Sequence, residues 1–320
     1  MAHTDTGTDT GGSGREHGRE HGPDCGKPTA IRALRREVPG IVALLASEED
    51  FAAMRRYVSF GFDDHARYLR RMEGLLRALS SQGVHTTVAL FDPVAYQEYC
   101  AHTRLDPDTP TSRSRYTAEV ASTGATVVYE GQPIDQLLPR LITAAEERAT
   151  WEYASAVLAR AGGCGGRDGC GHGTGRAAFD RATAALYAVL DAAGPGLHHL
   201  VCSVPVDDTP LAAVVHATAR EGRPPRLAEP GALVFRTVLA CGIATGSPGG
   251  IVLRTSLPGA PDTVRGWALR DGWPRPLSEA EVFTAYCTDA HTGEPIPPEH
   301  GVEYRAGLPL PRPLPRTEEG

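Results

Sequence analysis

The sequence predicts an α/β protein, with a Rossmann-like parallel sheet in the first half followed by an α+β region with an antiparallel hairpin. Over residues 40–162, short apolar runs alternate with segments of helical periodicity, an order typical of parallel strands joined by crossover helices. Beyond about residue 230, β-favouring runs are separated by Gly-, Ser- and Pro-rich residues, as in hairpins. The 320 residues suffice for one large domain or two modest ones.

Three short apolar runs in the first half suit strands buried on both faces: residues 41–46, 86–91 and 125–129. Residues 57–60 suit a short strand or the tail of the preceding helix. A long helical pattern covers residues 133–160, and Pro139 within it predicts a kink or a restart.

Polar residues with helix-capping character begin the helices of this half. Ser47, Asp64 and Asp92 each precede a segment of helical spacing, and Pro93 occupies the first helical position after Asp92. The helix after Asp64 is expected to end at Gly83.

In the second half, the pattern predicts a helix over 177–193, a strand over 200–204 and a helix from Thr209 to about Gly222. Residues 233–240 and 251–256 are expected to be strands of a hairpin with a long loop.

Near the end of the chain, two local signals conflict. Ser278 and Glu281 have capping-box spacing, whereas residues 282–287 favour a strand. The residues beyond 306 are rich in proline and suit a loose tail.

Composition shifts along the chain predict five segments. The first is expected to be disordered because it has almost no apolar residues to bury. The five segments are a disordered tail (1–38), a Rossmann-like domain (39–162), a Gly/Cys-rich linker or insert (163–176), an α+β domain (177–306) and a Pro-rich tail (307–320).

The composition excludes several classes of function. Lys27 is the only lysine, and it lies in the predicted tail, so neither a P-loop nucleotide site nor a PLP Schiff base is expected. The arginine-rich, Ala/Gly/Pro-rich composition is typical of a high-GC bacterial genome. A net charge of −7 argues against nucleic-acid binding.

The chain is expected to be cytoplasmic. The sequence contains no run of 18 apolar residues, so no membrane span is expected, and the N-terminus lacks the apolar stretch of a signal peptide. Seven cysteines at irregular spacing indicate a reducing compartment rather than a disulfide framework.

The Gly-rich insert carries three metal-ligand side chains, Cys164, Cys170 and His172. Thiolate and imidazole suit tetrahedral zinc, and glycines permit the tight turns that such a site needs. A fourth ligand is missing locally and would have to come from Asp168, Cys202 or the pair His198–His199. The alternative is a flexible linker with incidental cysteines.

A second candidate site lies at the expected carboxyl edge of the first-half sheet, where open parallel sheets bind ligands. Ser47, Asp63, His65 and Asp92 fall near this edge. Carboxylates there could bind Mg²⁺ or orient a hydroxyl, and His65 could act as acid or base. Alternatively, Ser47 and Asp92 are only helix caps.

Two functions remain open from the sequence. The first is a regulatory or small-molecule-binding protein without catalytic machinery, with a small molecule or a protein as its partner. The second is a small-molecule hydrolase or transferase that uses Asp63, His65 and Asp92.

Overall fold

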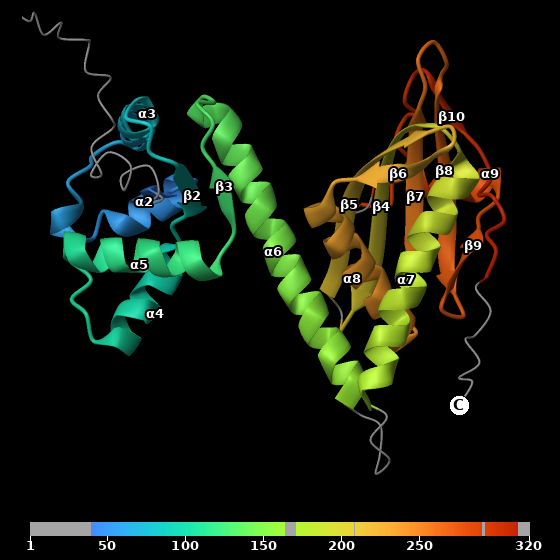
Figure 1. Ribbon diagram of the computed structural model, residues 1–320, viewed down its shortest axis with the longest axis horizontal. Coiled ribbons are helices and arrows are strands. Elements are labelled where there is room, and N and C mark those ends of the chain that lie inside the picture. The colour runs from blue at the N-terminus through green and yellow to red at the C-terminus, as the bar shows by residue number, and fades with distance from the viewer. Residues whose placement is uncertain (1–39, 164–170, 208, 290–291, 313–320) are drawn as a thin grey trace, which may run out of the picture.

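The computed structural model describes residues 40–163, 171–207, 209–289 and 292–312. They form two lobes joined by one long helix, α6 (Ile134–Gly163) (Figure 1). The cores of the first lobe use residues 42–141, and the core of the second lobe uses residues 154–273 with Leu308 and Leu310 packed against it.

The first lobe contains a small sheet, sheet A, of strands β1 (Gly40–Leu44), β2 (Thr86–Leu90) and β3 (Thr126–Val128), in that order. β1 and β2 are parallel, whereas β3 is antiparallel to β2. The prediction of a Rossmann-like parallel sheet is therefore wrong, because sheet A has one parallel pair only.

The direction of β3 follows from the connection that precedes it. Two helices, α4 (Pro93–Thr103) and α5 (Pro110–Thr123), lie between β2 and β3. One helix would return the chain to the edge at which β2 begins, and the second helix brings it back to the other edge. α5 has few apolar residues, so the sequence pattern did not indicate it.

The two faces of sheet A are covered by different helices. Val42, Leu44 and Val88 pack with α3 (His65–Ser81) and the start of α6. The other face meets α5 and an aromatic cluster that also involves α2 (Glu48–Met54), η1 (Val58–Phe60) and α4. In the segment 57–60, predicted to be a short strand or a helix tail, residues Val58–Phe60 thus form a 3-10 turn with Tyr57 as its N-cap.

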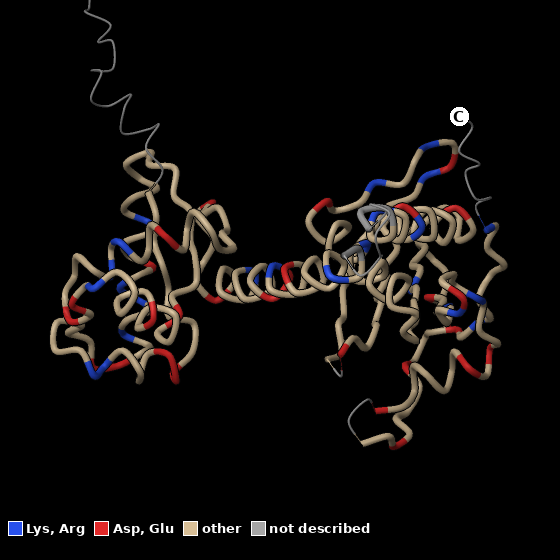
Figure 2. Tube along the Cα trace, turned by 90° about the horizontal axis from the view of Figure 1, so that it is seen from below, with Lys and Arg blue, Asp and Glu red and all other residues tan. Residues whose placement is uncertain are grey.

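α6 is continuous over 30 residues, with Pro139 inside it, so the helix does not restart there. Its start contributes Leu137 and Leu141 to the first lobe, and its end contributes Ala154 and Val157 to the second. Residues 142–153 have no buried side chain. Figure 2 shows both signs of charge on this stretch between the lobes.

The second lobe is built on sheet B, whose strand order is β10-β8-β7-β4-β5-β6 with β9 added beside β8. It is a curled antiparallel half-barrel in which only β10 runs parallel to its neighbour (Figure 1). The strands are β4 (Gly196–Val206), β5 (Thr209–Arg220), β6 (Arg223–Leu227), β7 (Gly250–Ser256), β8 (Asp262–Arg270), β9 (Trp273–Pro276) and β10 (Val302–Tyr304).

One face of sheet B is covered by α7 (Gly171–Ala193), α8 (Glu229–Thr245) and the end of α6. Two predictions in this lobe are wrong. The expected helix after Thr209 is β5, in which buried and exposed residues alternate. The expected strand over 233–240 lies in α8, whose eleven buried residues are spread around the helix, so that no helical period is visible in the sequence.

The end of the described chain is also more ordered than the sequence predicts. A capping box at Ser278 starts α9 (Glu279–Tyr286), which resolves the conflict between helix and strand in favour of the helix. The residues up to 312 pack on the lobe, since Trp267 Nε1 donates to the Leu308 carbonyl at 2.8 Å. Within the described ranges, no helix is long and apolar enough to cross a membrane.

Candidate functional site

Two of the predicted first-lobe residues, Ser47 and Asp92, cap the helices that follow β1 and β2. Ser47 caps α2, accepting from the backbone N–H of Asp50 at 3.0 Å. Asp92 caps α4, and its Oδ1 accepts from the N–H groups of Val94 and Ala95 at 2.8 and 3.1 Å. Both capping predictions are confirmed.

His65 and Asp63 have different surroundings at this edge. The Nε2 atom of His65 lies 3.1 Å from the carbonyl of Leu45, and its ring contacts Phe51 and stacks on Tyr68. Asp63 is exposed in the loop before α3. The contacts found for the described residues do not join Asp63, His65 and Asp92 to one another, so a shared ligand there stays a prediction.

The zinc hypothesis of the Gly-rich insert falls mostly outside the described residues. This holds for Cys164 and Cys170, and also for the side chain of His172, whose backbone belongs to the first turn of α7. Among the described residues, no group of three or more His, Cys, Asp or Glu side chains is arranged to bind a metal ion. Zinc binding by the insert therefore stays a prediction.

The open face of sheet B forms a pocket of about 500 Å³. Because alternate residues of a strand face opposite sides, one set of side chains packs under α7 and α8 and the other set lines the pocket. Strands β4, β5 and β7 provide most of the lining, and α9 provides Tyr286. The residues are Leu197, His198, His199, Val201, His216, Val252, Arg254, Ser256, Asp262 and Tyr286.

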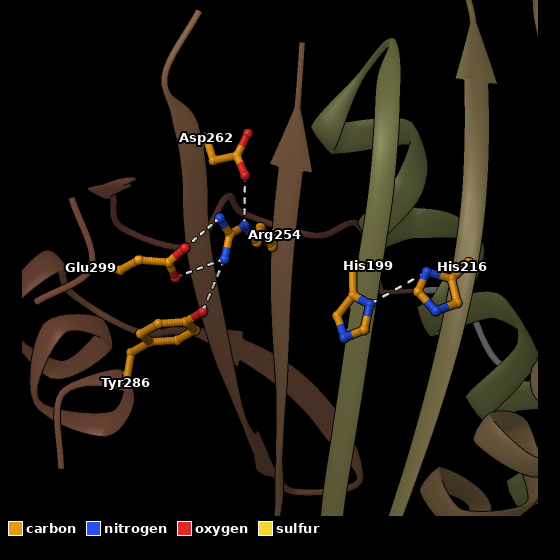
Figure 3. Close-up of polar contacts among 6 residues, drawn as sticks. All are labelled: His199, His216, Arg254, Asp262, Tyr286 and Glu299. Atoms are coloured by element: carbon orange, nitrogen blue, oxygen red, sulfur yellow. Dashed lines mark hydrogen bonds and ion pairs between the residues drawn. The ribbon is translucent and has the colours of Figure 1, made fainter. Parts of the chain in front are cut away.

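Two histidines face each other across neighbouring strands in this pocket. His199 on β4 is directly opposite His216 on β5, and their Nδ1 atoms are 3.3 Å apart (Figure 3). Burial lowers the pKa of His199, and the nearby His216 and Arg254 lower it further. When both rings are neutral, one Nδ1 donates to the other, which leaves the donating ring with a free Nε2 acceptor and the accepting ring with an Nε2 donor.

Arg254 on β7 lies beside His199 and is tied to two carboxylates. Its Nε donates to Asp262 at 2.6 Å, and its two terminal nitrogens donate to Glu299 at 2.8 and 2.9 Å (Figure 3). A longer contact of 3.4 Å joins it to the hydroxyl of Tyr286.

This network has electrostatic and mechanical consequences. Hydrogen bonds from Ser256 and Arg254 lower the pKa of Asp262, and the bond from Arg254 lowers that of Glu299. Both carboxylates raise the pKa of Arg254. The network also ties α9 and the loop before β10 to the sheet, and Tyr286 of α9 lines one wall of the pocket.

His198 faces largely the other way, as strand alternation requires. Its Nδ1 is 3.0 Å from the Thr255 hydroxyl and its Nε2 is 2.9 Å from the Gly194 carbonyl. Burial lowers its pKa. Cys202 is fully buried, and burial raises the pKa of its thiol, which is unlike a reactive thiolate.

The sequence could not indicate most of the pocket. His216 lies in a segment that the pattern assigned to a helix, and Arg254, Tyr286 and Glu299 are separated by many residues along the chain. The adjacent residues His198 and His199 were visible in the sequence. Which of them faces the pocket can be decided only when the strands beside β4 are known.

A family model matches part of the chain. Residues 29–132 match the model of a family described as a domain of unknown function (DUF8829). This range covers most of the first lobe, and the pocket of sheet B lies outside it. No curated protein and no solved structure matches the chain.

Proposed function

We propose that the protein binds a small molecule in the pocket on the open face of sheet B, without catalysing a reaction on it. The pocket itself carries this proposal, because a volume of about 500 Å³ is typical of small-molecule sites. Its lining combines apolar side chains with a few convergent polar groups, which is the usual composition of such sites.

The wall of the pocket supports binding rather than chemistry. Arg254, Asp262 and Glu299 use their charges on one another, so they hold the wall in place. Cys202, the nearest thiol on β4, is buried on the opposite face. A protein built in this way offers shape and hydrogen bonds to a ligand.

The lining also suggests which kind of ligand fits. Leu197, Val201 and Val252 give the pocket an apolar floor that suits an apolar body. The hydrogen-bonded histidine pair presents a donor and an acceptor together, which suits an amide or an alcohol-bearing polar group. We therefore propose an amphipathic ligand with its polar group near His199 and His216.

Native mass spectrometry of the full chain purified from its natural source tests the proposal. The wild-type protein is expected to carry a non-covalent small molecule. Val252→Trp, which fills the floor of the pocket, should abolish it. Val94→Trp makes the same change at a side chain of the first lobe that is 67% exposed, and should retain the ligand.

A wild-type protein without any bound molecule contradicts the proposal if it also fails to show a thermal shift with a panel of amphipathic metabolites. Retention of the ligand by Val252→Trp contradicts the placement in this pocket. Circular dichroism of the Val252→Trp protein checks that the sheet is still folded.

A further inference from the structure

The pair His199–His216 has a distance between its Nδ1 atoms that a shared metal ion also fits. We propose that the two Nδ1 atoms bind one divalent transition-metal ion of the zinc class, with its other coordination positions open to the pocket. The metal is expected to bind whether or not the small molecule proposed above is present, and it replaces the hydrogen bond between the two rings.

The distance between the two nitrogens is the first argument. Two imidazole nitrogens that bind one tetrahedral zinc at about 2.0–2.1 Å are about 3.3–3.4 Å apart. The Nδ1 atoms of His199 and His216 are 3.3 Å apart. The same distance also suits a hydrogen bond between the rings, so a metal ion can replace the shared proton without moving the two nitrogens apart.

The second argument is that the fold holds both ligands in position without the metal. β4 and β5 are paired in unbroken register from Gly196 opposite Ala219 to Val206 opposite Thr209, and the histidines lie within this ladder. Directly opposite residues of an antiparallel pair have Cβ atoms about 4.5–5.5 Å apart. The two rings are already in contact, with centroids 4.6 Å apart, so little ordering is needed when a metal binds.

Access and local charge also permit a cation here. His216 is exposed and His199 half-buried on the open face, so an ion reaches the pair from solvent. The guanidinium of Arg254 lies beside His199, and its charge is offset by Asp262 and Glu299 (Figure 3).

Two protein ligands make an open site rather than a closed structural one. Since no group of three or more ligand side chains occurs in the described part of the chain, water or the pocket ligand would complete the coordination. We therefore expect weaker zinc binding than in a structural four-ligand site. Ligand atoms of the pocket's small molecule would have direct access to the ion.

A zinc titration of the full-length, EDTA-treated chain tests the proposal. Cys25, Cys164 and Cys170 are replaced by serine in every sample, so that thiolates of the tail and the insert do not compete. Calorimetry should show a binding event that His199→Gln and His216→Gln each weaken by more than about tenfold. His102→Gln, at an exposed histidine of α4, is the control and should leave it unchanged.

A second readout protects the test against unfolded variants. Zinc should raise the melting temperature of the background protein, which carries only the three Cys→Ser changes, and of the His102→Gln protein. It should not raise that of the His199→Gln or His216→Gln protein. Metal-free melting curves show whether the variants fold. An equal zinc response in all four proteins overturns the proposal, and so does the lack of any zinc response in the background. Because no small molecule is added, this result is independent of the proposed ligand binding.

Discussion

Gly307 lies so close to Gly266 that a Cβ atom at residue 307 would be 2.3 Å from the carbonyl oxygen of Gly266. Neighbouring backbone bonds fix this approach: Gly307 donates to Leu277 and Leu277 donates to Gly266, at 2.9 and 3.0 Å. The segment after β10 can therefore pack on β8 and β9 only because residue 307 lacks a side chain.

Gly307→Ala is predicted to lower the free energy of unfolding of the second lobe by about 1–3 kcal/mol, because backbone must move to accept the methyl group. Urea unfolding measures the change. Gly74→Ala is the control, since a Cβ on Gly74 in the exposed face of α3 meets nothing within 4 Å. It should be neutral or slightly stabilising. An unchanged Gly307→Ala protein would show that this contact does not form.

Acid is predicted to destabilise the second lobe through His198. Burial lowers the folded-state pKa of His198 below the value of about 6.5 in the unfolded chain. The contribution of neutral His198 to the stability of the folded lobe is therefore complete above about pH 6.5, and it is lost as pH falls through the folded-state pKa of His198. Urea unfolding between pH 7.5 and pH 5 should show this loss.

His198→Gln removes the titrating group, so its stability should depend less on pH over that range, by up to about 1.4 kcal/mol per pH unit. His85→Gln changes an exposed histidine of the other lobe and should keep the wild-type dependence for the second-lobe transition. Parallel pH profiles for wild type and His198→Gln would contradict the assignment.

The parts of the fold that the sequence predicted are those fixed by local chemistry. Ser47, Asp64, Asp92 and Ser278 all cap helices as expected, because a capping side chain bonds to its own backbone two or three residues on. Strand direction was mispredicted because it depends on how many helices precede β3, and α5 has little apolar periodicity. The apolar α8 gave no period that separates helix from strand.

The candidate site was harder to predict than the fold because it depends on strand neighbours. His199 meets His216 only through the register of β4 with β5, and Arg254 joins them only because β7 pairs with the other edge of β4. A sequence shows that such residues exist but not that they face one another. By contrast, the positions of Ser47 and Asp92 follow from local order alone, since each residue caps the helix directly after it.

The two lobes are predicted to unfold in separate transitions, because their buried clusters share no residue and α6 carries no buried side chain over residues 142–153. Leu76 and Leu186 are both fully buried, one in each lobe. Each change to alanine should cost about 2–5 kcal/mol in its own lobe only. Differential scanning calorimetry should show each variant shifting a different transition. One transition shifted by both variants would mean that the lobes unfold together.

Asp92 is predicted to matter for stability through its cap. Asp92→Ala removes the acceptor for two N–H groups of α4 and should cost about 1 kcal/mol, whereas Asp92→Asn keeps an acceptor and should cost less. Thermal unfolding of the first lobe measures both. A loss of several kcal/mol in Asp92→Asn would mean that Asp92 has a structural role beyond its cap, and it would contradict the hypothesis of a ligand site at the edge of sheet A.

Arg254 is predicted to control the order of the pocket wall more than the stability of the lobe. Its guanidinium bonds to Asp262, Glu299 and Tyr286 in different directions, which the ammonium group of lysine cannot reproduce. Arg254→Lys should therefore raise amide hydrogen exchange in α9 and in the residues before β10, because these segments lose their tie to β7. The strands β4 and β5 should stay protected, since their ladder does not involve Arg254.

Arg226→Lys, on the edge strand β6, is the matched control and should leave exchange in α9 unchanged. If Arg254→Lys also leaves α9 protected, the wall is held by packing of Val282 and Leu277 against Gly266, and the ion pairs contribute little to it.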